Sequence, residues 1–316
     1  MTERPTIDDI RMAHDRIRGV VHRTPVLTCS SLDRLSGCRL FLKGEHVQRV
    51  GAFKFRGACN AVLSLSDGEA KHGVCTHSSG NHAQALARAA LERGIQAFIV
   101  MPTSAPRVKR LAVEGYGATV VDCEPTLAAR EDTAAQVVEE TGAAFIHPYD
   151  DPRIVAGAGT AAVELLEDVS DLDVMIAPVG GGGLMSGTCL AAAAMMPDIR
   201  LIGAEPEGAD DASRSLVAGE RISQRNPDTI CDGLLTSLGQ LTWPILRDHL
   251  ETIVTVSDEL VVEAMRLLWT RAKVVVEPSG ATPLAAVLSQ ASPIRPGSRV
   301  GLILSGGNVD LENLPW

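Results

Sequence analysis

Aromatic residues, lysine and long hydrophobic runs are all scarce in this chain of 316 residues. Aromatic side chains make up 3% of it, and no stretch reaches the roughly 18 consecutive apolar residues that a membrane helix needs. The first nine residues, MTERPTIDD, contain no apolar run behind a basic start, which disfavours a secretory signal. The sequence therefore indicates a globular protein without a membrane partner, and its 45% of hydrophobic residues is enough to build a large core.

A net positive charge and cysteines at paired spacing are also lacking. The formal net charge is -10, and an acidic surface disfavours nucleic acid as a partner, although local charge can still hold a small anion. The cysteines are odd in number, and no two of them have C-x-x-C spacing, which is typical of reduced thiols in a cytoplasmic protein. These seven residues are Cys29, Cys38, Cys59, Cys75, Cys123, Cys189 and Cys231.

Short aliphatic runs alternate with alanine-rich helical stretches along most of the chain. Helices are predicted over residues 81–93, closed by Gly94, and over residues 108–114, closed by Gly115. Ser257 is the expected cap of a further helix that runs to about Arg271. The alternation predicts an α/β fold in which mostly parallel, twisted sheets are covered by helices on both faces. Strands are predicted at residues 95–101, 118–121, 174–177, 200–204 and 300–304.

One of the five lysines stands in an unusual setting. Lys54 lies in the segment GAFKFRGA (residues 51–58), flanked by two phenylalanines and close to glycines. An amine in such a place loses solvation, which lowers its pKa and makes it a usable nucleophile toward an aldehyde. The competing interpretation is a lysine that begins a helix and extends into solvent, and this segment alone does not decide between the two.

Two glycine-containing turns have the composition of anion-binding sites. The segment THSSGNH (residues 76–82) follows a short strand and opens a helix, so that its N–H and hydroxyl groups suit a carboxylate. The segment APVGGGGLMSG (residues 177–187) leads a strand into four glycines, whose N–H groups can converge on one phosphate. It has neither the G-x-G-x-x-G nor the Walker pattern, which disfavours a dinucleotide or a nucleoside triphosphate. Plain capping turns remain the alternative for both segments.

A third polar turn, LSGGN (residues 304–308), follows the last predicted strand. Ser305 stands at the carboxyl end of that strand, where open α/β sheets place ligand contacts. A glycine turn without a ligand is the alternative. Together the four segments would supply a nucleophilic amine, a carboxylate cradle, a phosphate loop and a polar group for a ring.

In combination, these four segments resemble those of the fold-type-II pyridoxal-phosphate enzymes, whose fold is like that of the tryptophan synthase β-subunit. Within that class the chain resembles the group of serine racemases, serine/threonine dehydratases and 3-hydroxyaspartate dehydratases, from His22-Arg23-Thr24-Pro25 to its end. The resemblance implies a large cofactor-binding domain of residues 1–68 and 151–316 and a small domain of residues 73–147. It also implies a homodimer, in addition to the cytoplasmic location that the cysteines indicate.

The resemblance further implies roles for particular residues. Lys54 would join the cofactor covalently and remove the substrate's α-proton, and Ser79 would be the acid or base on the opposite face. The hydroxyl of Ser305 would leave the ring nitrogen unprotonated, which favours prompt loss of a β-leaving group. The implied cofactor contacts are Phe53, Lys54, Asn81, Gly180, Gly181, Gly182, Gly183 and Ser305. The implied substrate contacts are Ser78, Ser79, Asn81, His82, Arg130 and Thr236.

Two further features bear on a metal and on specificity. The acidic segment EPEGADD (residues 205–211) resembles the divalent-cation site of the same group, with Glu205, the Ala209 carbonyl and Asp211 as ligands for Mg²⁺ or Ca²⁺. Arg130 resembles a residue near the distal end of the substrate, with Thr236 beside it, where a guanidinium could pair with a second carboxylate. A solvated acidic turn and a surface arginine are the respective alternatives.

These features favour a dehydratase, or ammonia-lyase, that eliminates water from a small β-hydroxy amino acid and yields a keto acid and ammonia. The candidate substrates are 3-hydroxyaspartate, serine and threonine. A serine racemase with secondary dehydratase activity is the nearest alternative, because Ser79 permits racemisation without proving it. An alternative of another class is a non-catalytic protein that binds phosphate or an amino acid and leaves Lys54 as a free amine.

Overall fold

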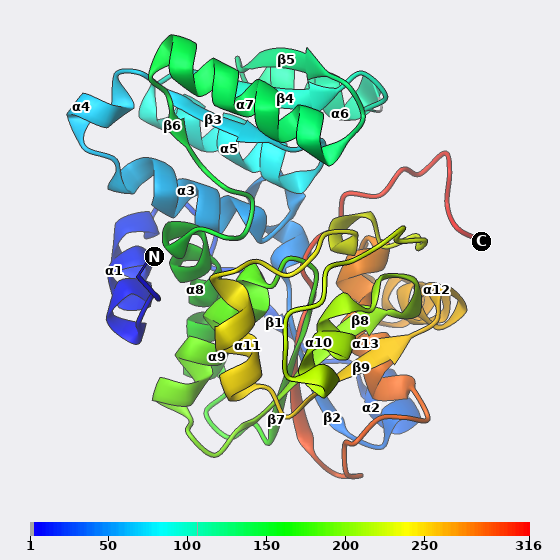
Figure 1. Ribbon diagram of the computed structural model, residues 1–316. Coiled ribbons are helices and arrows are strands. Elements are labelled where there is room, and N and C mark those ends of the chain that lie inside the picture. Colours follow the sequence, from blue (N-terminus) through cyan, green and yellow to red (C-terminus); the bar gives the residue numbers. More distant parts are fainter. Residues whose placement is uncertain (1–2, 106) are drawn as a thin grey trace.

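The strands form two separate sheets in the computed structural model, which describes residues 3–105 and 107–316 (Figure 1). Within these residues the larger sheet has the order β1-β2-β10-β7-β8-β9, and the smaller one has the order β5-β4-β3-β6. The pair β1–β2 is antiparallel and the other pairs are parallel. The prediction of an α/β fold with mostly parallel sheets is therefore confirmed. The strands are β1 (Val26–Leu27), β2 (Arg39–Lys43), β3 (Val74–His77), β4 (Ala97–Pro102), β5 (Thr119–Cys123), β6 (Ala144–Phe145), β7 (Val174–Pro178), β8 (Arg200–Pro206), β9 (Thr252–Val256) and β10 (Arg299–Ile303).

The α-helices cover both sheets. Helix α5 begins and ends at the predicted residues, and Gly94 follows it in the left-handed conformation that ends many helices. Helix α6 differs from the prediction because it includes Gly115, and the left-handed glycine is Gly117. The helices are α1 (Ile7–Ile17), α2 (Ser30–Ser36), α3 (Lys54–Ser64), α4 (Asp67–Ala70), α5 (Asn81–Arg93), α6 (Arg107–Gly115), α7 (Leu127–Thr141), α8 (Pro152–Asp168), α9 (Gly183–Met195), α10 (Asp211–Ala218), α11 (Thr242–His249), α12 (Asp258–Leu267) and α13 (Pro278–Leu288).

Helix α12 starts as predicted and ends earlier than predicted. The hydroxyl of Ser257 accepts a hydrogen bond from the N–H of Leu260 and so caps the first turn. The α-helical part stops at Leu267, and a π-helical turn (Leu268–Ala272) follows it. Lys273 then adopts a left-handed conformation with φ 62°, which turns the chain away from the helix axis.

The glycine-rich stretch at residues 157–159 lies inside helix α8. A β-carbon at Gly157 would meet the backbone of Arg56 and Gly57 on α3, and one at Gly159 would meet the backbone of Gly187 on α9. The glycines are therefore needed where three helices cross at close range, and they are not part of a linker.

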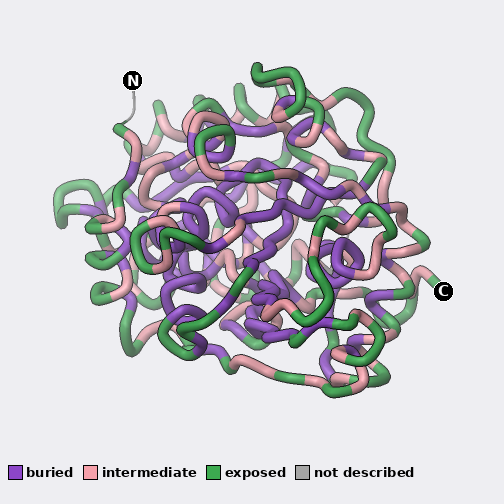
Figure 2. Tube along the Cα trace, turned by 90° about the horizontal axis from the view of Figure 1, so that it is seen from below, coloured by how far each residue is buried: buried purple, intermediate pink, exposed green. Residues whose placement is uncertain are grey.

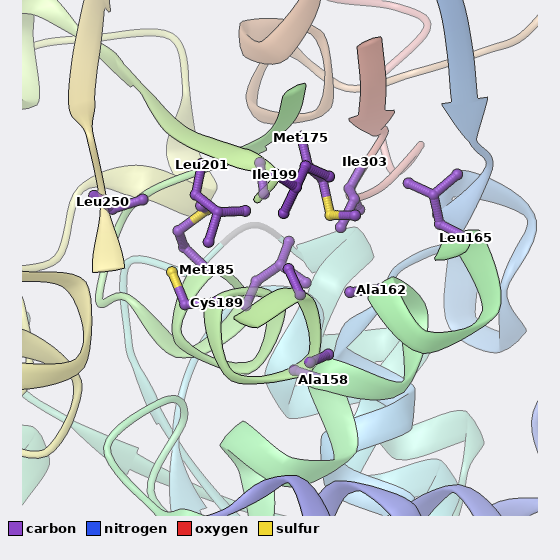
Figure 3. Packing of buried hydrophobic residues seen from close by; sticks show 14 of the residues in the cluster. Ala158, Ala162, Leu165, Met175, Met185, Cys189, Ile199, Leu201, Leu250 and Ile303 are labelled. Atoms are coloured by element: carbon purple, nitrogen blue, oxygen red, sulfur yellow. The ribbon is translucent and has the colours of Figure 1, made fainter. Parts of the chain in front are cut away.

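Buried apolar side chains fill the layers between the sheets and helices. Figure 2 shows that the buried stretches of the chain, in purple, lie in the interior of the molecule. One cluster joins helices α8 and α9 to the larger sheet, and Figure 3 shows Ala162, Cys189, Met175 and Leu201 meeting there. A second cluster packs α12 and α13 against the same sheet, and a third lies under the smaller sheet. No helix of the described residues is long and apolar enough to cross a membrane.

Candidate functional site

Lys54 is the first residue of helix α3 and lies beside the strand end that carries Ser305. The N–H of Phe53 donates to the carbonyl of Ser305 at 2.9 Å, and Ala52 forms an isolated bridge with Gly306. The amine of Lys54 donates to the carbonyl of Pro148 at 3.0 Å. Burial lowers the pKa of this amine to about 8, against a partial opposing effect of the Glu277 charge. Near neutral pH, a useful fraction of the amine is therefore unprotonated and nucleophilic.

The four consecutive glycines form a cradle at the start of helix α9. All four are buried, and Gly182 has a φ of 88°, which a residue with a side chain rarely adopts. A β-carbon at Gly181 would overlap the ring of Tyr149, so only glycine fits beside that ring. Within residues 3–105 and 107–316, the N–H groups of Gly180 to Gly183 donate no hydrogen bond to a protein group. This arrangement at a helix N-terminus suits a phosphate.

The amino end of helix α5 forms a second anion site. Gly80 caps this helix without a side chain, which leaves the first N–H groups of the helix available, and the hydroxyl of Ser78 accepts from the Gly80 N–H at 3.3 Å. Ser79 is half-buried in the same turn. His82 is 2% exposed, and neither of its ring nitrogens has a partner among the described residues. Burial, followed by the charge of Lys54, lowers the pKa of His82 well below its usual value, so this ring is neutral.

Asn81, at the start of helix α5, is hydrogen-bonded to Glu277, a residue at the start of helix α13 that the sequence did not reveal. Its side-chain amide donates to the Glu277 carboxylate at 2.9 and 3.1 Å, and its carbonyl oxygen accepts from Asn308 at 2.9 Å. Glu277 is 3% exposed, and burial raises its pKa to about 7. The sole signal in the sequence is an acidic residue between an apolar run and Pro278, which is usual for a helix start.

Ser305 and Arg130 occupy different environments. Ser305 is 4% exposed at the carboxyl end of β10. Arg130, on helix α7, has a buried Nε without a hydrogen-bond partner in the described chain, and its charge reaches His77. Burial, with smaller effects of His147 and Arg130, lowers the pKa of His77 to about 4. Thr236 is exposed, and no hydrogen bond joins it to Arg130 in the described chain, so their joint role stays a prediction.

The predicted metal ligands meet where β8 ends. The carboxylate of Glu205 is buried and accepts from the N–H groups of Ala212 and Ser213 at 3.1 and 2.9 Å. Burial is the main cause that raises the pKa of Glu205 to about 9 and that of Asp211 to about 6, and the negative charge of Asp211 adds to the shift of Glu205. The Oδ1 atom of Asp211 is buried without a partner in the described chain. Among all the residues that the structure describes, no group of three or more His, Cys, Asp or Glu side chains is placed to hold a metal ion.

The fold and the site together define an enzyme class in which a desolvated lysine, a phosphate cradle and a carboxylate cradle meet between two α/β layers. The residues fit pyridoxal phosphate, because Lys54 presents a nucleophilic amine and the glycine loop presents N–H groups without partners.

Comparisons with known proteins agree with this class. The family model described as pyridoxal-phosphate dependent enzyme matches residues 17–306. The chain is 50% identical to a β-hydroxyaspartate dehydratase of Paracoccus denitrificans (strain Pd 1222), over 99% of each protein. It is 52% identical to a serine racemase of Arabidopsis thaliana, over 96% of this chain and 93% of that protein. A solved T.th. threonine deaminase is 47% identical with a TM-score of 0.93, and the match covers 98% of this chain and 100% of that one.

The chain therefore belongs to the family of pyridoxal-phosphate-dependent enzymes, and the prediction of the fold-type-II class is confirmed. The family supports an enzyme that acts on small amino acids, rather than the non-catalytic binding protein that the sequence alone left open.

Proposed function

We propose that the enzyme is a dehydratase that eliminates water from a small β-hydroxy amino acid, with 3-hydroxyaspartate as the preferred substrate. The observation that carries this preference is Arg130, which forms no ion pair with a carboxylate of the described chain and has a buried Nε without a partner. A guanidinium in that condition suits a second carboxylate on the substrate. The β-hydroxyaspartate dehydratase that is 50% identical to this chain supports the same reaction class.

The proposed roles follow from where each group lies. Pyridoxal phosphate supplies an aldehyde that binds amines and a ring that withdraws electrons from the substrate's α-carbon. The N–H groups of Gly180 to Gly183 hold the phosphate, and Ser305 offers the ring nitrogen a neutral hydroxyl. The first turn of α5 and the neutral ring of His82 orient the substrate carboxylate. The amine of Lys54 then removes the α-proton, and Phe53 lies against that amine with its ring centroid 5.2 Å away.

A substrate panel tests the proposal. L-serine, D-serine, L-threonine and the stereoisomers of 3-hydroxyaspartate are each incubated with the holoenzyme, and ammonia and keto acid are measured. We expect the highest kcat/KM for one stereoisomer of 3-hydroxyaspartate and no turnover by Lys54→Ala. An Arg130→Gln variant should lose activity mainly toward 3-hydroxyaspartate. Equal losses toward serine would remove the basis of the preference.

A serine racemase with secondary dehydratase activity is the second candidate. Ser79 favours it, because it precedes the helix cap Gly80 in the turn that holds the substrate carboxylate, where its hydroxyl can serve the face opposite Lys54. The serine racemase that is 52% identical supports the same possibility. Chiral chromatography of serine incubated with the wild type and with Ser79→Ala separates the candidates, since racemisation should vanish in the variant while elimination persists.

We infer that Glu205, the Ala209 carbonyl and Asp211 bind a divalent cation such as Mg²⁺ or Ca²⁺. Two buried carboxyl groups with raised pKa values and one unpartnered oxygen support a cation at this place. Addition of Mg²⁺ should raise the thermal midpoint of the wild type by several degrees, and Asp211→Asn should abolish that shift. Asp210→Asn, which changes the exposed partner of Arg214, is the matched control. A shift of equal size in all three proteins would contradict the assignment.

We also propose that residues 1–68 and 151–316 form the large domain and residues 73–147 the small one, in a cytoplasmic homodimer. The two-sheet arrangement supports the division, because strands β3 to β6 pair only with one another among the described strands. Limited proteolysis between the two parts and sedimentation of the holoenzyme test the division and the dimer.

A further inference from the structure

The segment of residues 147–151 connects β6 to α8 and is anchored at the site from two directions. The carbonyl of Pro148 accepts the hydrogen bond from the amine of Lys54 at 3.0 Å. Two residues later, the carboxylate of Asp150 accepts from the N–H groups of Gln240 and Leu241 at 2.9 and 2.8 Å, next to the start of helix α11. The residue between these anchors, Tyr149, is therefore held in place before a ligand arrives.

The ring of Tyr149 is also held by its neighbours. It lies against Gly181 so closely that a β-carbon there would overlap it. The ring of His147 meets it edge-on, with centroids 4.6 Å apart. The Nδ1 atom of His147 in turn accepts from the N–H groups of Tyr149 and Asp150 at 3.3 and 2.9 Å, which fixes the loop that carries the ring. A side chain packed on so many sides has little freedom to move aside.

The hydroxyl of Tyr149 lies within electrostatic range of helix α7. The side chain of Thr236 and the charge of Glu131, which follows Arg130 on helix α7, both contribute to the pKa of this hydroxyl. Burial is the main cause that raises the pKa of Tyr149 to about 12. The phenol therefore remains a hydrogen-bond donor throughout the working range of pH.

We propose that Tyr149 is a specificity-determining residue whose hydroxyl donates a hydrogen bond to the second carboxylate of a four-carbon substrate. It acts from the side of the glycine loop, while the guanidinium of Arg130 acts from helix α7. The inference rests on the proposed function, because serine and threonine carry no second carboxylate. A hydrogen bond from a neutral donor to a carboxylate is stronger than one between neutral groups, so the contact selects for the dicarboxylic substrate.

The chain offers a matched pair of variants because it contains two tyrosines. Tyr149→Phe keeps the ring packed on Gly181 and removes only the hydroxyl. Tyr116→Phe makes the same change at a half-buried tyrosine whose ring lies 5.8 Å from the guanidinium carbon of Arg88. Both holoenzymes are compared with the wild type in kcat/KM for 3-hydroxyaspartate and for L-serine. The inhibition constant of succinate, an unreactive four-carbon dicarboxylate, is measured with L-serine as the substrate.

The expected result is specific to Tyr149→Phe. Its preference for 3-hydroxyaspartate over serine should fall about 10- to 100-fold, and the inhibition constant of succinate should rise by a similar factor. Serine kinetics, the absorbance of the bound cofactor and the thermal midpoint should match those of the wild type and of Tyr116→Phe. Equal losses toward both substrates, weaker cofactor binding, or unchanged succinate inhibition would overturn the inference.

The same measurements separate this inference from the proposed function. If the wild type releases no keto acid from 3-hydroxyaspartate, the proposed function fails, and the succinate comparison still decides whether Tyr149 contacts a dicarboxylate. If the wild type acts on 3-hydroxyaspartate and Tyr149→Phe keeps its full preference and its succinate inhibition, the proposed function stands and the role of Tyr149 is lost.

Discussion

At the scale of single residues, Lys54 couples function to stability through its charge. Burial places its pKa at about 8 in the folded protein, against an ordinary value of 10.5. Below pH 8 the amine is protonated in both the folded and the unfolded chain, and burying that charge destabilises the folded cofactor-free protein. As the pH rises from 8 toward 10.5, the folded protein has lost the proton while the unfolded chain still holds it, so the destabilisation fades.

Replacing Lys54 by methionine should therefore stabilise the cofactor-free protein. At pH 7 the free energy of unfolding in urea should rise by about 1 kcal/mol or more, and the gain should shrink as the pH approaches 10. Lys71→Met, which alters an exposed lysine, is the control. A stability gain that does not depend on pH, or one shared by Lys71→Met, would contradict a desolvated amine.

Glu277 is the second residue whose charge is unusual. It accepts hydrogen bonds from the Asn81 amide and from the Asn308 N–H, and its pKa of about 7 is raised first by burial and then by Asp232. As the pH rises through 7 the carboxyl becomes a carboxylate, which fixes the Asn81 amide with its NH₂ group toward Glu277.

We expect kcat of the wild type to rise between pH 6 and 8 and that of Glu277→Gln to be lower by about tenfold, without this rise. The absorbance of the bound cofactor should change with pH in the same way, because Asn81 is the proposed contact of the cofactor ring. If kcat of Glu277→Gln rises with pH as that of the wild type does, a group other than Glu277 controls the rise between pH 6 and 8. Glu259→Gln removes one negative charge from an exposed residue and serves as the control.

At the scale of elements, the glycine loop at the start of α9 is the part that tolerates least change. Gly181→Ala should overlap the Tyr149 ring, lower the thermal midpoint and weaken cofactor binding by tenfold or more, as measured by titration of the cofactor-free protein. Gly115→Ala, at the end of α6, meets no atom within 4 Å and has no left-handed backbone. It should leave both quantities unchanged or slightly improved. Comparable losses in both variants would mean that the loop contacts are not the cause.

Patterns within a few neighbouring residues correctly predicted the helices and strands whose formation depends on those neighbours alone. The prediction of strand 174–177 agrees with β7 within one residue, and that of helix 81–93 agrees with α5 at both ends, because aliphatic runs and a closing glycine act over a few residues. Strand β2 was not predicted, because it ends in Lys43, whose buried amine is stabilised by Glu164 at 2.6 Å. That partner lies 121 residues away, and no local pattern reveals it.

The same distinction holds for the site. The glycine loop and Lys54 stand out from composition alone, whereas Glu277 reaches Asn81 across 196 residues and the position of Tyr149 depends on anchors in three separate segments. Only the assembled fold brings those groups together. The candidate site could thus be predicted where a single segment carries the chemistry, and it could not where the chemistry depends on long-range pairing.

At the scale of the whole molecule, one of the ion pairs between the two parts lies near the glycine loop. Lys109 on α6 bonds to Asp232 at 2.7 Å, and thereby joins the part built on the smaller sheet to the loop that covers Gly180. The Lys109 side chain is 30% exposed and that of Asp232 52%, so the pair contributes roughly 0.2–1 kcal/mol. This energy is too small to govern unfolding, but a contact of this strength between the two parts can change the affinity for substrate by up to about fivefold.

Lys109→Gln should therefore raise KM by about two- to fivefold while kcat and the thermal midpoint stay nearly constant. Salt supplies an independent check, because roughly 0.5 M NaCl screens an exposed pair. The KM of the wild type should rise with salt more steeply than that of Lys109→Gln, since the variant has already lost the interaction. Lys71→Gln removes an exposed positive charge from the end of α4 and should behave as the wild type. If the salt dependence of KM is the same in all three proteins, the contact between Lys109 and Asp232 does not hold the two parts together during catalysis.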